Sequence, residues 1–283
     1  MTIAVSLKVN DGVVLASDSA SSLIAKDPSG NIGVINIYEN ANKVFNLRKG
    51  LPIGLITWGA GSIGNSSIST LAKDLRKRFS GKGSDHSDWK IDEGDYKVSD
   101  IAQKVKQFMV DENYTPAFDS WAQKPSIGFV VAGYSSNDTF AEEYKIEVKN
   151  GNVVGPELLR GKDQVGVTWN GEPEAINRLF FGFSSTLPGV LKKKMNMTDN
   201  DIQNMVDIIR QNCTANLVFP AMPIQDAIDL ARFLAYLTIN YSRFSPGAPT
   251  VGGPIEIAAI TKHENFKWID RKLYFSENVN PEA

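Results

Sequence analysis

The opening strand and turn place the strongest constraint on how this chain folds. Residues 3–9 alternate between larger apolar side chains and small or polar ones, and Asn10-Asp11-Gly12 separates them from a second apolar run at residues 13–16. Asp-Gly favours the positive φ values of a tight hairpin turn. The sequence therefore predicts a β-hairpin at the start of the chain and antiparallel pairing in the sheet built on it.

Strands and helices then follow in blocks rather than in regular alternation. Apolar side chains at spacings of three and four predict helices, and shorter apolar runs bounded by turn residues predict strands. The predicted strands cover residues 43–47, 51–57, 127–132, 144–154 with a turn at Asn150-Gly151, 255–261 and 268–275. The predicted helices cover residues 68–79, 101–109, 174–180, 200–212 and 224–239, and longer connections are expected at residues 21–42 and 81–96.

This order predicts the α+β class. Two stacked antiparallel sheets with helices over both outer faces accommodate it, in a four-layer αββα sandwich. No internal repeat or linker divides the sequence. One domain over residues 1–283 is therefore expected, with a short tail at residues 276–283.

Charge and hydropathy argue against two classes of function. Lys and Arg number 30 against 32 Asp and Glu, a net charge of −2, with no stripe of one sign along the chain. A dedicated nucleic-acid binder is therefore not expected. A membrane span is not expected either, since no uncharged apolar run approaches the ~18 residues that a span requires. Pro188, Gly189, Pro220 and Pro223 interrupt the longest runs.

Cysteine and histidine usage predicts a cytoplasmic protein without a metal site or cofactor. A single cysteine, Cys213, forms no internal disulfide, which fits a reducing compartment. No signal-peptide pattern follows Met1. Cys213 has apolar neighbours within a predicted helix, so a buried structural thiol is expected. His86 and His263 are isolated, and no group of residues has metal-ligand spacing.

The segment Gly59-Ala60-Gly61-Ser62-Ile63-Gly64 allows two readings that we consider less favoured. It fits the G-x-G-x-x-G dinucleotide fingerprint, but the region ~20 residues later is a polar loop rather than a parallel strand ending in an acidic residue. It also resembles a nucleophile elbow, with Ser62 as nucleophile and His263 as base. The simpler reading of Ser62 is a residue at a helix N-terminus that binds backbone N–H groups.

Thr2, Asp18 and Lys43 form a different set of reactive side chains. Loss of Met1 would give Thr2 a free α-amine, whose ordinary pKa of ~7.7 to 8.0 suits a general base. The predicted hairpin brings Asp18 back beside Thr2, and Lys43 paired with Asp18 would favour ionisation of the Thr2 hydroxyl. The Gly59–Gly61 turn can present N–H groups to an oxyanion. On spacing alone, an ordinary strand start, a turn residue and a surface charge remain the simpler interpretation.

At these residues the sequence resembles the β-type subunits of the 20S proteasome and bacterial proteasome-like peptidases, which are N-terminal-nucleophile (Ntn) hydrolases. The matching stretches are Thr2-Ile3-Ala4-Val5, residues 11–18, Asn42-Lys43-Val44 and Gly59-Ala60-Gly61. The resemblance implies the αββα Ntn fold and threonine peptidase activity through an acyl-enzyme on Thr2.

The resemblance also implies roles for individual residues. By position, Thr2 is nucleophile and base, Asp18 and Lys43 activate it, and Gly61 provides the oxyanion-hole N–H. Ser22 would bind the substrate backbone in extended form. The positions near the side-chain specificity pocket are Ala41, Phe45, Gly59 and Ile63.

The chain departs from the family pattern in two places. The interval from Asp18 to Lys43 is longer than usual and implies an enlarged loop around residues 27–38. The segments that support the nucleophile in the second half have their nearest counterparts at residues 168–171 and 245–253, and the latter contains no aspartate.

The resemblance further implies a homo-oligomeric ring that encloses the sites and takes peptides or unfolded proteins as substrates, with an ATP-dependent unfoldase as a candidate partner. Two alternatives stay open: a non-catalytic ring or scaffold protein of the same fold, and an amidase that uses the same N-terminal chemistry on a small molecule.

Overall fold

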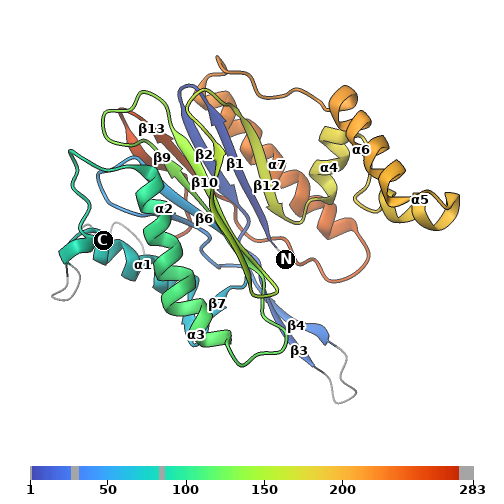
Figure 1. Ribbon diagram of the computed structural model, residues 1–283, viewed down its shortest axis with the longest axis horizontal. Helices are drawn as coiled ribbons and strands as arrows, with labels where there is room; N and C mark the ends of the chain where they lie inside the picture. Colours follow the sequence, from blue (N-terminus) through green and yellow to red (C-terminus); the bar gives the residue numbers. More distant parts are fainter. Residues whose placement is uncertain (1, 27–31, 83–86, 274–283) are drawn as a thin grey trace.

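Two antiparallel five-stranded sheets stack on each other in the middle of the molecule (Figure 1). The computed structural model describes residues 2–26, 32–82 and 87–273. The first sheet has the order β12 (Gly166–Gly171), β1 (Ile3–Val9), β2 (Gly12–Ser17), β13 (Glu256–Thr261) and β14 (Asn265–Asp270). The second sheet has the order β11 (Asn152–Arg160), β10 (Glu142–Lys149), β9 (Ile127–Gly133), β6 (Ile53–Gly59) and β5 (Val44–Asn46).

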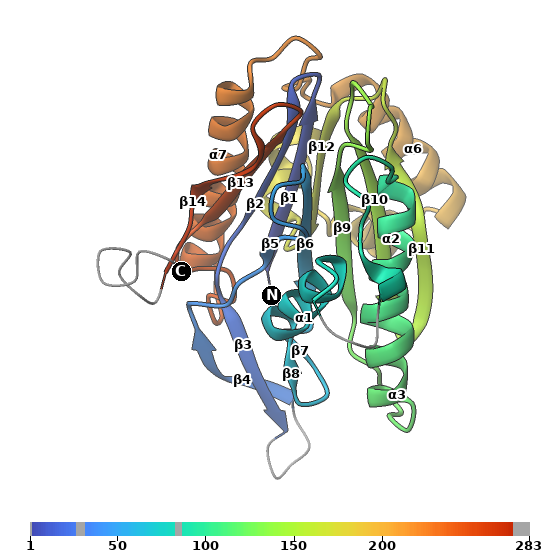
Figure 2. The same ribbon diagram turned by 90° about the vertical axis from the view of Figure 1, so that its left-hand side faces the viewer.

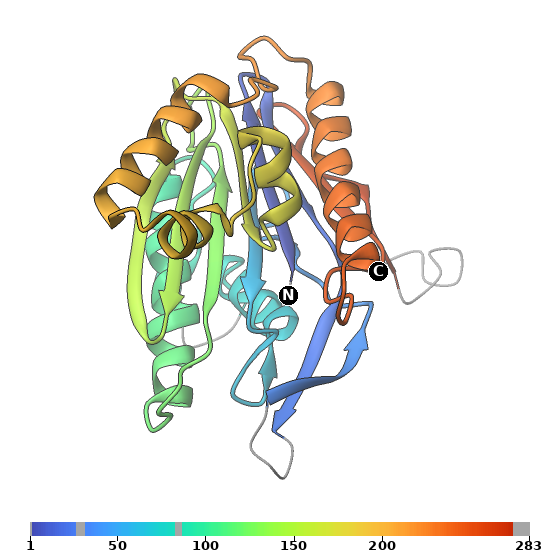
Figure 3. The ribbon, with the colours of Figure 1, turned by 90° about the vertical axis from the view of Figure 1, so that its right-hand side faces the viewer.

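Helices cover the outer face of each sheet, so four layers follow one another in Figure 2. On the first sheet lie α4 (Glu174–Phe181) and α7 (Ile224–Phe244), also seen in Figure 3. On the second lie α1 (Ile68–Phe79) and α2 (Val98–Lys106), which continues through a π-helix (Gln107–Tyr114) into α3 (Thr115–Phe118). The predicted α+β four-layer sandwich of antiparallel sheets is confirmed.

The alternation along β1 explains why this strand lies between two layers. Ile3, Val5 and Leu7 pack against the helices of the first sheet, whereas Ala4 packs against the second sheet. All residues of β1 and β2 are buried because both faces of the sheet are covered. Apolar burial on two sides is the main stabilising contribution to this half of the fold.

The connection expected at residues 21–42 contains a second hairpin. Strands β3 (Ser21–Lys26) and β4 (Ile32–Tyr38) pair antiparallel and project away from the body of the molecule (Figures 1 and 2). The expected loop is therefore wrong for these two strands, while residues 27–31 lie outside the described part. The apolar side chains of this hairpin, including Ile35, are largely exposed. The sequence therefore carried no core periodicity that would predict the two strands.

Several other boundaries differ from the predictions. The strand expected over residues 144–154 is the hairpin β10–β11, whose turn residues Asn150 and Gly151 both have positive φ. β12 and α5 (Leu187–Met195), which has Pro188 near its start, were not predicted. A short 3-10 helix (Ser87–Trp89) lies within the expected loop at residues 81–96. The tail at residues 276–283 lies outside the described residues.

Cys213 is exposed, so the expected buried thiol is wrong. It is the last residue of α6 (Asp199–Cys213), which packs with α5 through a small cluster of its own around Leu191, Ile202 and Val206. Cys213 shares the helix face of Ile202 and Val206, but the cluster ends at Val206, and the last turn of α6 is exposed. Among the described helices, none is long and apolar enough to cross a membrane.

A buried ionic cluster joins the two sheets near the edge formed by β11 and β12. Glu143 pairs with Arg160 and accepts a hydrogen bond from Ser6 on β1. Lys8, also on β1, donates to the carbonyl oxygens of Lys162 and Gln164 at 3.0 and 2.6 Å. Burial lowers the pKa of Lys8. Because a one-residue shift of β1 would turn these side chains toward the helices, the cluster favours a single strand register.

Gly171, at the end of β12, allows β12 and the start of β1 to approach each other closely. Its φ is +97°, and a Cβ there would overlap the carbonyl oxygen of Thr2. Gly50 has a similar φ of +86° but has open space around its Cβ position. We expect Gly50→Ala to lower the free energy of unfolding by only about 1–2 kcal/mol, the conformational cost of a positive φ.

Gly171→Ala should lower the free energy of unfolding by ~1–3 kcal/mol more than Gly50→Ala does, because the overlap with Thr2 forces a backbone shift. Urea denaturation of both variants checks this difference. Equal midpoints for the two variants would show that the close approach of β12 and β1 is not a constraint.

Candidate active site

Thr2 lies at the start of β1, where β12 runs beside it. Its side chain is buried, with 5% of the residue exposed. Its carbonyl oxygen accepts a hydrogen bond of 2.7 Å from the Glu172 amide. The segment at residues 168–171, predicted as a supporting segment, thus contacts Thr2 through its last glycine and the residue that follows.

Asp18 follows β2 and is returned to the start of β1 by the first hairpin. Its carboxylate is fully buried and accepts three backbone hydrogen bonds, from Ile3 at 3.0 Å and from Ala20 and Gly252 at 3.1 Å each. These donors replace the water that a buried carboxylate would lose. They also join three separate chain segments at one side chain.

Lys43 completes a buried ion pair with Asp18. Its ammonium lies 2.7 Å from Asp18 Oδ1, and its carbonyl oxygen accepts from the Thr57 amide at 3.0 Å. Burial lowers the pKa of Lys43, and the charge and hydrogen bond of Asp18 oppose that shift. Asp18 Oδ1 therefore accepts from both the Lys43 ammonium and the amide of Ile3, the residue that follows Thr2.

The turn after β6 places a backbone N–H group at the same site. Gly59 has a φ of +89°, and a Cβ there would overlap the carbonyl oxygen of Ser126. The Ala60 amide donates to that same oxygen at 2.9 Å. Within residues 2–26, 32–82 and 87–273, the Gly61 amide donates to no acceptor, so it is available to a ligand.

These groups line a pocket of about 370 Å³, which we name the threonine pocket. Its lining includes Thr2, Lys43 and Gly61, together with three of the predicted substrate-binding residues, Ser22, Ala41 and Gly59. Phe45 and Ile63 are not part of its lining. Ile63 is buried in the core beneath α1, and Phe45 lines a neighbouring hollow.

A second ionic group lies beside Asp18 and was not predicted from the sequence. Lys272 donates to Ser19 Oγ at 2.6 Å and lies 2.9 Å from the buried Glu256 carboxylate, while Ser19 donates to the Pro254 carbonyl. Burial lowers the pKa of Lys272. Glu256 precedes four apolar residues in β13, and that unusual position was the available signal in the sequence.

The two other interpretations of residues 59–64 do not fit this geometry. Ser62 is exposed in the short strand β7 (Ser62–Ile63), and the N-cap of α1 is Ser67. His263 lines a hollow with Asn10 and Asp11, at the opposite end of β1 from Thr2. β6 pairs only antiparallel, unlike the strands of a dinucleotide fold. The described residues hold no group of three His, Cys, Asp or Glu able to bind a metal ion.

Three solved structures are similar to this chain over most of its length. They are a helical assembly of the Anbu complex from Pseudomonas aeruginosa (TM-score 0.47), an Anbu Gly-1 mutant from Hyphomicrobium sp. strain MC1 (0.48) and Anbu from that strain (0.44). Each is 13% identical, and the matches cover 99% of this chain and 91%, 91% and 92% of those chains. No protein-family model and no curated protein matches the sequence. Similarity at this level identifies neither a family nor an activity.

The lowered pKa of Lys43 gives a titration that can be measured. We expect its ammonium to lose its proton below pH 10.5, whereas the exposed Lys162, whose pKa Asp138 raises, titrates above that value. The unfolded chain binds more protons at Lys43 between the lowered pKa and 10.5, so this residue makes stability rise with pH across that window. NMR of labelled lysine side chains measures both titrations in one sample. A Lys43 midpoint at or above 10.5 would contradict the proposed effect of burial.

Proposed function

We propose that this protein is a threonine peptidase in which Thr2, exposed by removal of Met1, is both nucleophile and general base. The observation that supports this most is the buried Asp18–Lys43 ion pair at a pocket lined by Thr2. Two buried charges require close pairing and further hydrogen bonds, and the carboxylate has three backbone donors. Such an arrangement suits the orientation of a reacting group more than it suits stability.

The proposed reaction begins with proton transfer from the Thr2 hydroxyl to the free α-amine. Thr2 Oγ then attacks the carbonyl carbon of the scissile amide, and the resulting oxyanion accepts a hydrogen bond from the Gly61 amide. The α-ammonium returns the proton to the leaving amine as the C–N bond breaks. Water, deprotonated by the same α-amine, then hydrolyses the Thr2 ester and restores the hydroxyl. The Lys43 ammonium lowers the energy of negative charge on Oγ.

The volume, rim and lining of the threonine pocket suit an extended peptide. Its volume of about 370 Å³ lies at the lower end of the range for ligand pockets. β3 begins at its rim with Ser21 and Ser22, whose backbone can pair with a substrate strand. Ala41 and Ile68 give one wall a small apolar surface for a substrate side chain.

We also propose that copies of this chain associate through the β3–β4 hairpin, in the homo-oligomeric ring expected from the sequence. Leu23, Ile24, Ile35 and Tyr38 are each exposed on it. A two-stranded hairpin is only marginally stable alone in water, so a projecting apolar hairpin gains stability from a covering surface. The hairpin begins at the threonine pocket, so association there would also enclose the site.

Activity and mass measurements test the proposed nucleophile. We expect the intact mass to lack Met1 and the protein to cleave fluorogenic peptide amides. Thr2→Ala should lower kcat/KM by about 1,000-fold or more, because it removes the nucleophile. Ser62→Ala, the neighbouring hydroxyl of the rejected elbow, should leave kcat/KM unchanged.

Other outcomes would point to other functions. Retained Met1 together with undetectable hydrolysis would favour the scaffold protein. Loss of activity only in Ser62→Ala would establish the serine mechanism instead. Cleavage of small amides but not of peptides would favour the amidase.

A matched pair of surface variants tests the association. Ile35 on the hairpin and Ile208 on α6 are 63% and 61% exposed. We expect Ile35→Lys to shift the sedimentation profile toward smaller species, because a buried charge weakens the interface. Ile208→Lys should leave the profile unchanged. A monomeric wild-type protein, or identical profiles for both variants, would contradict the proposed association.

A further inference from the structure

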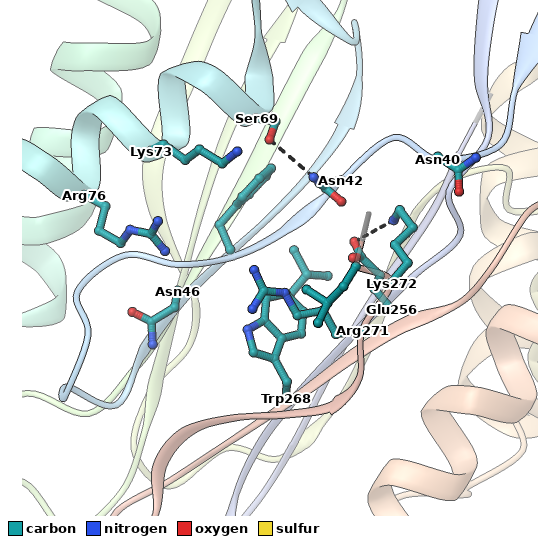
Figure 4. Close-up of a pocket in the computed structure, with 13 residues that line it drawn as sticks. Asn40, Asn42, Asn46, Ser69, Lys73, Arg76, Glu256, Trp268, Arg271 and Lys272 are labelled. Carbon is teal, nitrogen blue, oxygen red and sulfur yellow. Dashed lines mark hydrogen bonds and ion pairs between the residues drawn. The ribbon is translucent and has the colours of Figure 1, made fainter. Parts of the chain in front are cut away.

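A second hollow of about 370 Å³ adjoins the threonine pocket, and we name it the basic pocket (Figure 4). Asn42 lines both. Helix α1 also contributes to both, since Ile68 lines the threonine pocket and Lys73 and Arg76, farther along the helix, line the basic one. The two hollows are therefore neighbours along one helix.

The charges around the basic pocket are not balanced. Lys73 and Arg76 from α1 face Arg271, which follows β14 (Figure 4). In the described part of the chain, none of these three cations has a carboxylate within ion-pair distance. Among the described lining residues, the one acidic side chain is that of Glu256, which is paired with Lys272 at 2.9 Å. Burial and the nearby Arg271 charge lower the pKa of Arg76.

The lining can also recognise polar and planar groups. Asn46 Oδ1 is buried there without a hydrogen-bond partner among the described residues. The Trp268 ring forms one wall, with the Arg271 guanidinium 4.9 Å from its centroid. Two guanidinium groups, an ammonium and an unpartnered amide oxygen suit a carboxylate attached to a peptide, which has both acceptors and N–H donors.

We propose that the basic pocket binds an acidic side chain of the substrate, so that the preferred substrates of this protein are acidic peptides. This inference rests on the function proposed above. Lys73 and Arg76 are five and eight residues beyond Ile68, or about 8 and 12 Å along the helix. An extended peptide advances ~3.4 Å per residue, so from the pocket wall at Ile68 the acidic side chain is about two to four residues along the substrate.

Matched peptides test this preference. We would compare fluorogenic peptide amides that carry Glu or Gln two, three or four residues from the scissile bond. We expect the wild-type protein to cleave the better Glu peptide with a kcat/KM about tenfold above that of its Gln partner, a ratio that falls as salt is raised. The ratio should approach one in Lys73→Gln/Arg76→Gln.

The matched control is Lys193→Gln/Lys194→Gln, which removes the same charge from exposed positions on α5. It should retain the wild-type ratio. A wild-type ratio near one, or equal loss of the ratio in both double variants, would overturn the inference.

Binding without hydrolysis separates this inference from the proposed catalytic function. Rhodamine-labelled Glu and Gln peptides would be titrated into Thr2→Ala, with anisotropy as the readout. Tighter binding of the Glu peptide, lost when Lys73→Gln/Arg76→Gln is added, supports the basic pocket even if the wild-type protein hydrolyses no peptide. Equal affinities would overturn the basic pocket, while hydrolysis by the wild-type protein would leave the catalytic proposal intact.

Discussion

The Asp18 carboxylate is the contact on which the candidate active site depends. It accepts hydrogen bonds from Ile3, Ala20 and Gly252 and pairs with Lys43. Four segments distant in sequence thus meet at one buried charge. Burying a carboxylate without such partners would cost several kcal/mol. The fold that forms this site must therefore also supply the carboxylate with hydrogen-bond donors and a counter-charge. Asp18 also fixes the position of Thr2, because its carboxylate accepts a hydrogen bond from the amide of Ile3, the next residue.

The stacked sheets explain why the two pockets are adjacent. Thr2 precedes β1 and Asp18 follows β2 in the first sheet, whereas Lys43 precedes β5 and Gly61 lies just beyond β6 in the second. The threonine pocket lies between these ends, and α1 begins at its wall with Ile68. Since α1 then continues over the second sheet, its cationic side chains are carried into the neighbouring hollow.

The sequence predictions were more accurate for contacts between residues close together in the chain than for contacts between distant ones. The first hairpin is local, so its turn residues were sufficient to place Asp18 near Thr2. Gly252, Glu256 and Lys272 reach the site only through the pairing of β13 with β2, and no local pattern indicates that contact. The β3–β4 hairpin was taken for a loop because its apolar side chains are exposed and carry no core periodicity.

The sequence alone determined the first hairpin, the succession of strand and helix blocks that predicts the αββα class, and most of the longer helices, because alternation and turn residues act between near neighbours. Only the tertiary structure decided which charges are buried together, which backbone amides satisfy them and which cations lack a partner. Those properties depend on solvent exclusion and on distances of a few ångströms between segments far apart in sequence, and both arise only when the layers pack.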